Sequence, residues 1–124
     1  MAVIKTFEEL KCWQKARDLV KIVYTISSTG PISKDFDMRS QIRRAAVSVV
    51  NNVSEGFGRE SNKEFIRFLD IAHASCIEVK SMTYLLEDLS YVTAAVAEDI
   101  RTKANEVKAL IRGLMKYLRT DLEH

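Results

Sequence analysis

The sequence has few of the residues that interrupt helices, with one proline and four glycines among 124 residues. Because proline breaks a helix interior and glycine weakens one, this composition is typical of long helices. The hydrophobic content of 47% suits a single buried core, and a chain of this length forms one domain. We therefore predict one all-α domain over residues 1–121.

Cysteine is also scarce, and long apolar runs are lacking. The two cysteines, Cys12 and Cys76, are too few for a disulfide framework, so we predict that they are small core residues in a reducing compartment. No run of about 18 apolar residues occurs, and residues 1–9 lack the charged-then-apolar order of a signal peptide. These features predict a cytoplasmic protein with no membrane partner.

The end of the chain resembles part of an expression tag. Leu122, Glu123 and His124 match the start of a Leu-Glu-polyhistidine sequence, so we predict that residues 122–124 are derived from a vector. The formal net charge of +2 then becomes +3, because the carboxylate of Glu123 leaves the count.

Motifs for catalysis are lacking as well. His73 and Cys76 are spaced to supply two metal ligands from one helix, but the chain has no second pair of ligands. Neither an HExxH motif nor a nucleophile elbow occurs, and no paired histidine and cysteine has an orienting acid. We predict that the protein is not an enzyme and has no metal and no cofactor.

Apolar residues with helical spacing predict four helices, over residues 6–28, 33–56, 62–88 and 94–120. Gly30 and Pro31 end the first helix, and Ser33 is the expected N-cap of the second. Ser61 and Glu64 have the spacing of a capping box, so the third helix begins directly after a tight turn. Short connections between helices of similar length predict an antiparallel up-down-up-down four-helix bundle.

The third helix has more apolar surface than one bundle covers. Phe65, Phe68 and other residues form its main stripe, whereas Ile66, Ile77 and Tyr84 lie on another side. Large exposed apolar patches are rare on monomers. The surplus therefore indicates self-association.

Residues 41–59 form the most distinctive segment. A wide apolar stripe predicts burial on more than one side, and Gly56 and Gly58 bracket Phe57 where the stripe ends. We expect these glycines to form a C-terminal cap, because glycine enters the left-handed region without steric cost. The opposite face is polar, and its groups are either held by tertiary partners or exposed to a ligand. These polar residues are Gln41, Arg44, Ser48, Asn51, Asn52, Glu55 and Arg59.

Residues 41–49 (QIRRAAVSV) and 51–59 (NNVSEGFGR) resemble the signature of the bacterial four helix bundle protein family. That family includes proteins encoded in intervening sequences of 23S ribosomal RNA genes, also called S23 ribosomal proteins. It is related to the accessory variability determinant of diversity-generating retroelements. The resemblance implies a homopentamer whose partner is structured RNA, ribosomal RNA or a reverse-transcriptase complex. It also marks six signature residues as mainly structural, namely Gln41, Ser48, Asn52, Glu55, Gly56 and Gly58.

The fourth helix is the most basic part of the chain, with six basic and three acidic residues over positions 90–120. Four of its cations fall within about 40° on a helical wheel. We call these four residues, Arg101, Lys108, Arg112 and Arg119, the basic ridge. Their alignment suits contacts with successive phosphates. The alternative is a solvated outer face, which any surface helix needs.

A second group of cations lies on the second helix and around the turn that follows it. Its candidate nucleic-acid-binding members are Arg43, Arg44, Arg59 and Lys63, with Arg39 and Arg67 beside them. Guanidinium groups pair with carboxylates as readily as with phosphates, so internal ion pairs are the alternative. The available carboxylates are Asp35, Asp37, Glu55 and Glu78. Aromatic residues outside core positions are scarce, so the sequence does not predict recognition of single strands by stacking.

The leading hypothesis is a non-catalytic, oligomeric bundle that binds structured RNA through clustered arginine and lysine. Its RNA part depends on the family resemblance. The competing hypothesis is a protein-interaction or scaffolding module, like the retroelement accessory proteins, that does not bind nucleic acid directly.

Overall fold

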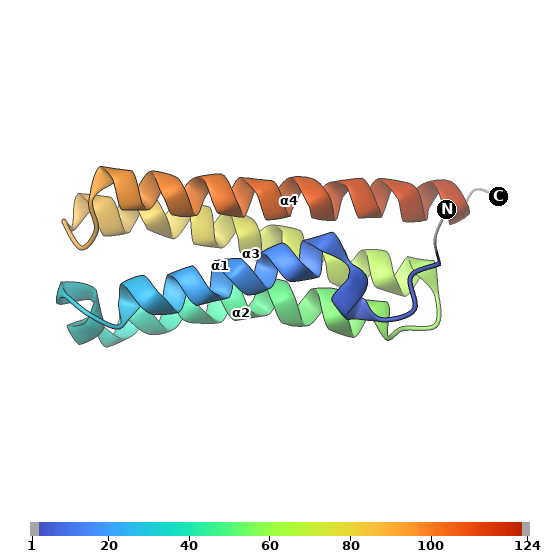
Figure 1. Cartoon of the computed structure of the whole chain (residues 1–124), viewed down its shortest axis with the longest axis horizontal. Helices are drawn as coiled ribbons and strands as arrows, with labels where there is room; N and C mark the ends of the chain where they lie inside the picture. Colours follow the sequence, from blue (N-terminus) through green and yellow to red (C-terminus); the bar gives the residue numbers. More distant parts are fainter. Residues whose placement is uncertain (1–2, 123–124) are drawn as a thin grey trace.

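The computed structural model describes residues 3–122 and contains four α-helices, α1 (Lys11–Ser27), α2 (Phe36–Phe57), α3 (Asn62–Asp88) and α4 (Ala94–Leu122). Two short 3-10 helices, η1 (Phe7–Glu9) and η2 (Pro31–Lys34), precede α1 and α2. Successive α-helices run in opposite directions along one long axis (Figure 1). No strand occurs in residues 3–122, and the predicted all-α four-helix bundle is confirmed. Glu123 and His124 of the predicted tag remnant lie outside the described residues.

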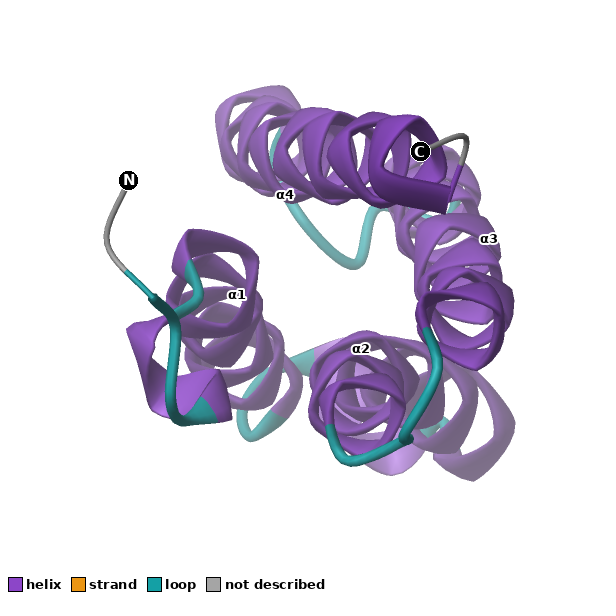
Figure 2. Cartoon of the chain, turned by 90° about the vertical axis from the view of Figure 1, so that its right-hand side faces the viewer, coloured by secondary structure: helices purple, strands orange, loops and turns teal. Residues whose placement is uncertain are grey.

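The core lies between all four helices. Helix α3 packs closely against both α2 and α4, and α1 completes the ring seen in Figure 2. Large aliphatic side chains such as Leu19, Ile42, Leu69 and Ile111 are fully buried. Burial of each such side chain stabilises the fold by roughly 1.5–3 kcal/mol relative to exposure. The predicted core position of both cysteines is also confirmed, since Cys12 and Cys76 are buried free thiols.

The first α-helix begins later than predicted. The chain forms the 3-10 turn η1, in which a carboxylate oxygen of Glu9 accepts hydrogen bonds from the backbone N–H groups of Lys5 and Thr6 at 2.7 and 3.2 Å. Leu10 then adopts an extended conformation and turns its side chain into the core. The α-helix therefore starts at Lys11 rather than near residue 6.

The N-cap of α2 is Asp35 and not the predicted Ser33. Ser33 lies within η2, where its hydroxyl donates to the carbonyl of Gly30 at 2.6 Å. One carboxylate oxygen of Asp35 accepts from the N–H of Met38 at 3.2 Å, and the other accepts from the hydroxyl of Tyr91 at 2.9 Å. This second bond ties the start of α2 to the turn between α3 and α4, and it raises the pKa of Tyr91.

The glycines at the end of α2 match the prediction in part. Gly58 is the C-cap of α2, as predicted, but its φ of −74° is not left-handed. A Cβ at Gly56 would lie 2.8 Å from Cβ of Phe68 and 2.9 Å from Cδ1 of Phe65. Gly56 is therefore required because α2 and α3 approach closely. The predicted cap of α3 is present, since the hydroxyl of Ser61 accepts from the N–H of Glu64 at 3.1 Å.

The surplus apolar surface of α3 is partly exposed. Ile77 and Tyr84 are 47% and 50% exposed, whereas Ile66 packs against the core. Among the helices of residues 3–122, none has the length and apolar content needed to cross a bilayer.

Candidate nucleic-acid interface

The basic ridge of α4 lies beside α3, which runs antiparallel to it. At one end of this helix pair, the side-chain amide of Asn62 donates to the carboxylate of Asp121 at 2.7 Å. At the other end, Arg101 contacts Glu87 across the two helices. Side-chain contacts therefore join α3 and α4 near both ends of the pair.

Arg101 does not belong to an exposed ridge. Its side chain is buried, with only 8% of the residue exposed. Its guanidinium is 3.1 Å from carboxylate oxygens of both Glu87 and Glu98, and 3.3 Å from the hydroxyl of Thr83. It also lies 4.2 Å from the ring centroid of Tyr84. We therefore correct the prediction for this residue: Arg101 is neutralised by Glu87 and Glu98, and its contacts with Glu87 and Thr83 join α4 to α3.

The other ridge arginines remain accessible. Arg112 and Arg119 are exposed, and with Lys116 they line a pocket of about 450 Å³ between α3 and α4. We call this pocket the α3–α4 groove; its remaining lining residues are Asp70, His73, Gly113 and Met115. Within the described residues, no ion pair involves Arg112, Lys116 or Arg119. Lys108 is half-buried next to this group.

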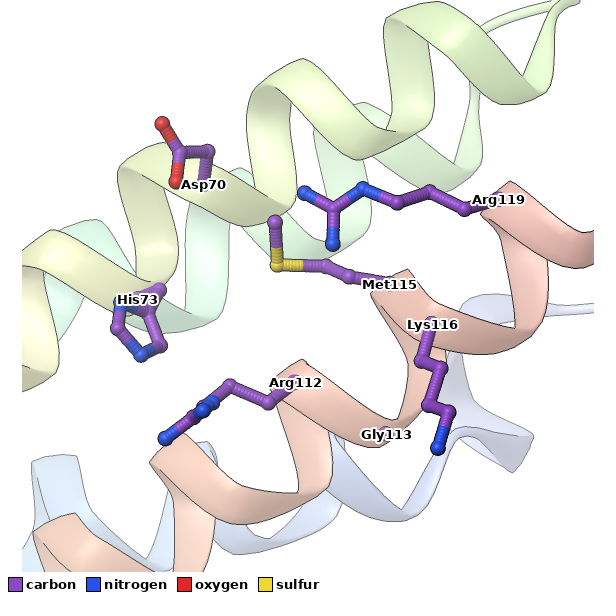
Figure 3. Close-up of a pocket in the computed structure, with 7 residues that line it drawn as sticks. All are labelled: Asp70, His73, Arg112, Gly113, Met115, Lys116 and Arg119. Carbon is purple, nitrogen blue, oxygen red and sulfur yellow. The ribbon is translucent and has the colours of Figure 1, made fainter.

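Only some of the side chains that line the α3–α4 groove point into it. In Figure 3, the ring of His73 hangs from α3 toward Arg112, and the guanidinium of Arg119 extends along the gap toward Met115. The carboxylate of Asp70 and the ammonium of Lys116 point away from this space. Arg112, Arg119 and His73 therefore line the same pocket.

His73 contributes an unusual polar atom to the groove. Its Nε2 is buried and has no hydrogen-bond partner within residues 3–122. Burial lowers the pKa of His73, and the positive charges of Lys108 and Arg112 lower it further, while Asp70 opposes the change. Burial and these two cations therefore favour the neutral form of His73 in the folded protein.

The second group of cations does not pair with the carboxylates suggested as alternatives. Arg43 donates to the hydroxyls of Ser27 and Ser28 at 2.7 and 3.2 Å, and it lies 4.3 Å from the ring centroid of Tyr24. Arg44 donates to the hydroxyl of Ser40 at 3.0 Å. In the described chain, neither Arg43 nor Arg44 forms an ion pair with a carboxylate. Both remain positively charged and unneutralised on the outer face of α2.

Arg59 and Lys63 lie at the turn between α2 and α3. Arg59 covers the ring of Phe68 at 4.6 Å, and Lys63 is exposed. The neighbouring Arg67 is 3.1 Å from the carboxylate of Glu64, and this contact lowers the pKa of Glu64. The turn lies at the same end of the bundle as the end of α4 (Figure 1). Arg59 and Lys63 thus lie at the same end of the bundle as Arg119.

The polar strip of α2 divides into a buried and an exposed part. The hydroxyls of Ser48 and Ser75 are 2.8 Å apart, and the side-chain amide of Asn52 donates to the carbonyl of Ser48 at 2.8 Å. Ser75 of α3 therefore holds Ser48, whereas Asn52 is held by Ser48 within α2. Gln41 donates to Glu78 at 3.4 Å. In contrast, Asn51 and Glu55 are exposed.

Exposed aromatic rings near the start of α2 were missed by the sequence interpretation. Phe36 is 65% exposed, and Arg39 lies 5.6 Å from its ring centroid. Phe36 and Tyr24 line a second pocket, of about 700 Å³, together with Arg39, Arg43 and Arg44. The available signal was the position of Phe36 directly after the N-cap, where a side chain of the first helical turn escapes the core.

The described residues contain no group of three or more histidine, cysteine or acidic side chains placed to bind a metal ion. Burial raises the pKa of Cys12 to about 11 and that of Cys76 to about 12. Both thiols are therefore protonated at neutral pH and poorly nucleophilic.

Comparison with known proteins agrees with this architecture. The sequence model of the 23S rRNA-intervening sequence protein family matches residues 8–113, which is most of the chain. The chain belongs to the 23S rRNA-intervening sequence protein family. The chain is also similar to a crystal structure of a protein of unknown function from the S23 ribosomal protein family of Bacteroides thetaiotaomicron VPI-5482. The TM-score is 0.76 at 28% identity, over 85% of this chain and 98% of that one. None of the curated proteins compared with the chain matches it.

Proposed function

We propose that this member of the 23S rRNA-intervening sequence protein family is a non-catalytic, cytoplasmic oligomer that binds structured RNA. One observation carries the proposal. Arg112, Lys116 and Arg119 line a single groove, and none of them pairs with a carboxylate within residues 3–122. Unpaired cations on one surface are the electrostatic feature that phosphate backbones require.

The position of the cations favours a duplex or a folded RNA as the ligand. Arg59 and Lys63 lie at the same end of the bundle as Arg119, so an RNA larger than the groove could also reach these cations. Guanidinium groups bind phosphate through two parallel hydrogen bonds, which adds geometric specificity to the charge attraction. Recognition through the backbone of a folded RNA needs no base-stacking platform within the groove.

Two observations support a non-catalytic role. The cysteine thiols are held protonated in the core, and burial, Lys108 and Arg112 lower the pKa of His73 in spite of the opposing charge of Asp70. A general base or nucleophile needs a group that activates it. Binding, rather than bond cleavage, is the chemistry that these side chains support.

Self-association is part of the proposal. Ile77, Tyr84 and Phe36 leave apolar surface on the outside of the bundle, and oligomers bury such patches. We propose a homopentamer, the assembly that the family resemblance implies. Cyclic symmetry would repeat the α3–α4 groove once for each subunit and would multiply its charge.

The proposal is tested by titrating a fluorescent RNA hairpin with protein at several salt concentrations. Arg112→Glu/Arg119→Glu is the test variant, and Lys11→Glu/Lys21→Glu on α1 is the matched control with the same change in charge. We expect the test variant to lose at least about tenfold in affinity and to show a salt slope reduced by about 1–2. The control should lose less affinity. Absence of wild-type binding at low salt, or equal losses in both variants, would overturn the proposal.

A second candidate function is a protein-interaction module. The pocket around Phe36 and Tyr24 combines exposed aromatic rings with Arg39, Arg43 and Arg44, which are residue types enriched in protein interfaces. This function predicts that Phe36→Ala/Arg44→Ala abolishes binding of a partner protein and leaves RNA affinity unchanged. Affinity chromatography from a bacterial lysate with wild type and this variant distinguishes the two functions.

A further inference from the structure

The α3–α4 groove contains a feature that general phosphate attraction does not need. Two arginines and one half-buried histidine line this single pocket (Figure 3). The volume of about 450 Å³ lies within the range of sites for small ligands. Donors that line one pocket differ from a row of cations along an open helix face, because the pocket limits the size of the ligand group that they bind.

We propose that the α3–α4 groove is a site for a single tetrahedral oxyanion, held by the guanidinium groups of Arg112 and Arg119, and that protonation of His73 strengthens its binding. The assignment of this oxyanion to a phosphate of RNA rests on the proposed function. The oxyanion site itself depends only on the side chains of the groove.

The arginines are free to bind such a group. Arg101, on the same side of α4, is neutralised by Glu87 and Glu98, whereas no carboxylate pairs with Arg112 or Arg119 within the described residues. Asp70 is the one acid that lines the groove, and its carboxylate points away from the opening in Figure 3. An oxyanion between the two guanidinium groups would therefore gain charge-assisted hydrogen bonds without displacing an internal partner.

His73 links this site to pH. The charged groups that face it are Asp70 from its own helix and Lys108 and Arg112 from α4. With the groove empty, the two cations and burial together make protonation of the ring unfavourable. An oxyanion next to Arg112 offsets these positive charges and makes protonation favourable. By thermodynamic linkage, the ligand then binds more tightly as pH falls and His73 gains its proton.

The protonation of His73, and its dependence on a bound oxyanion, can be measured directly. The imidazole of His73 has proton NMR signals that shift on protonation, and a His73→Gln variant assigns them. Sulfate is the probe, because it is a tetrahedral oxyanion whose charge does not change over about pH 5–8, where histidine titrates. Sodium chloride at equal ionic strength is the reference for screening.

We expect the pKa of His73 to be higher in sulfate than in chloride. Arg112→Gln/Arg119→Gln should abolish the difference, and each arginine should account for about a tenfold loss of sulfate affinity. Lys11→Gln/Lys21→Gln should retain the difference. His73→Gln should bind sulfate with an affinity that no longer increases at acid pH. The same His73 pKa in both salts, or a difference that persists in the arginine variant, would overturn the inference.

The two proposals fail in different ways. If sulfate raises the pKa of His73 but no RNA binds, the oxyanion site stands and the RNA function is wrong. If RNA binds but sulfate leaves His73 unchanged, the RNA function stands and the oxyanion site is wrong. If both proposals hold, adding the RNA hairpin should raise the pKa of His73 as sulfate does.

Discussion

Replacing Gly56 by alanine tests whether the contact between α2 and α3 depends on a missing side chain. The added Cβ would lie 2.8 Å from Cβ of Phe68 and 2.9 Å from Cδ1 of Phe65. Because Cβ of Phe68 is fixed to the backbone of α3, the two helices must move apart. Overpacking costs about 1–3 kcal/mol, and alanine recovers at most about 1 kcal/mol through helix propensity. We expect the free energy of unfolding to fall by about 1–2 kcal/mol.

Gly113→Ala is the matched control, because a Cβ at that position has no atom within 4 Å. Both substitutions lie within helices, so both gain helix propensity. Only Gly56→Ala also crowds a neighbour. Gly113→Ala should raise the free energy of unfolding by up to about 1 kcal/mol. Urea denaturation followed by circular dichroism, at one protein concentration, measures both changes. A Gly56→Ala protein at least as stable as wild type would refute the packing argument.

Three further predictions concern charged and titratable groups. Arg101→Met should cost about 1–3 kcal/mol in urea denaturation, because it breaks the ion pair with Glu87 that joins α3 to α4 and the ion pair with Glu98 within α4; a cost equal to that of Arg112→Met would contradict this role. Cys12 and Cys76 should resist Ellman's reagent at pH 8 until the protein unfolds, because burial raises the pKa of their thiols to about 11 and about 12; rapid reaction of the native protein would show otherwise. The free energy of unfolding should decrease as pH falls below 6.5, the ordinary pKa of histidine, because the pKa of His73 is lower in the folded state and the unfolded state then binds more protons. His73→Gln should flatten this part of the pH profile, and an identical profile would exclude His73 as its source.

Local signals in the sequence predicted much of the fold. The third helix has the predicted bounds of residues 62–88, because the Ser61 side chain caps its start and helical apolar spacing continues to its end. The predicted start of the first helix, at residue 6, was too early. Glu9 closes a 3-10 turn there, and the spacing of apolar residues alone does not distinguish such a turn from an α-helix. For Gly56, the sequence identified the residue but not the reason. Its close contact with Phe68 depends on how α3 packs against α2.

The candidate site was harder to predict, because it depends on contacts between helices. The helical wheel placed Arg101 in line with Arg112 and Arg119 but did not show that Glu87 reaches it from α3. The wheel also did not indicate that His73 lies near the basic ridge, because His73 belongs to α3 and the ridge belongs to α4. The carboxylates proposed for Arg43 and Arg44 were plausible by charge, yet nearby serine hydroxyls and the ring of Tyr24 are their partners.

Ultraviolet cross-linking of the protein to a bound RNA hairpin, followed by mass spectrometry of the peptides, tests most directly whether the α3–α4 groove binds RNA. We predict cross-links on both walls of the groove, at His73 of α3 and at Met115 and Lys116 of α4, and their loss in Arg112→Glu/Arg119→Glu. Cross-links confined to the pocket around Tyr24 and Phe36, or no cross-link at all, would contradict the account.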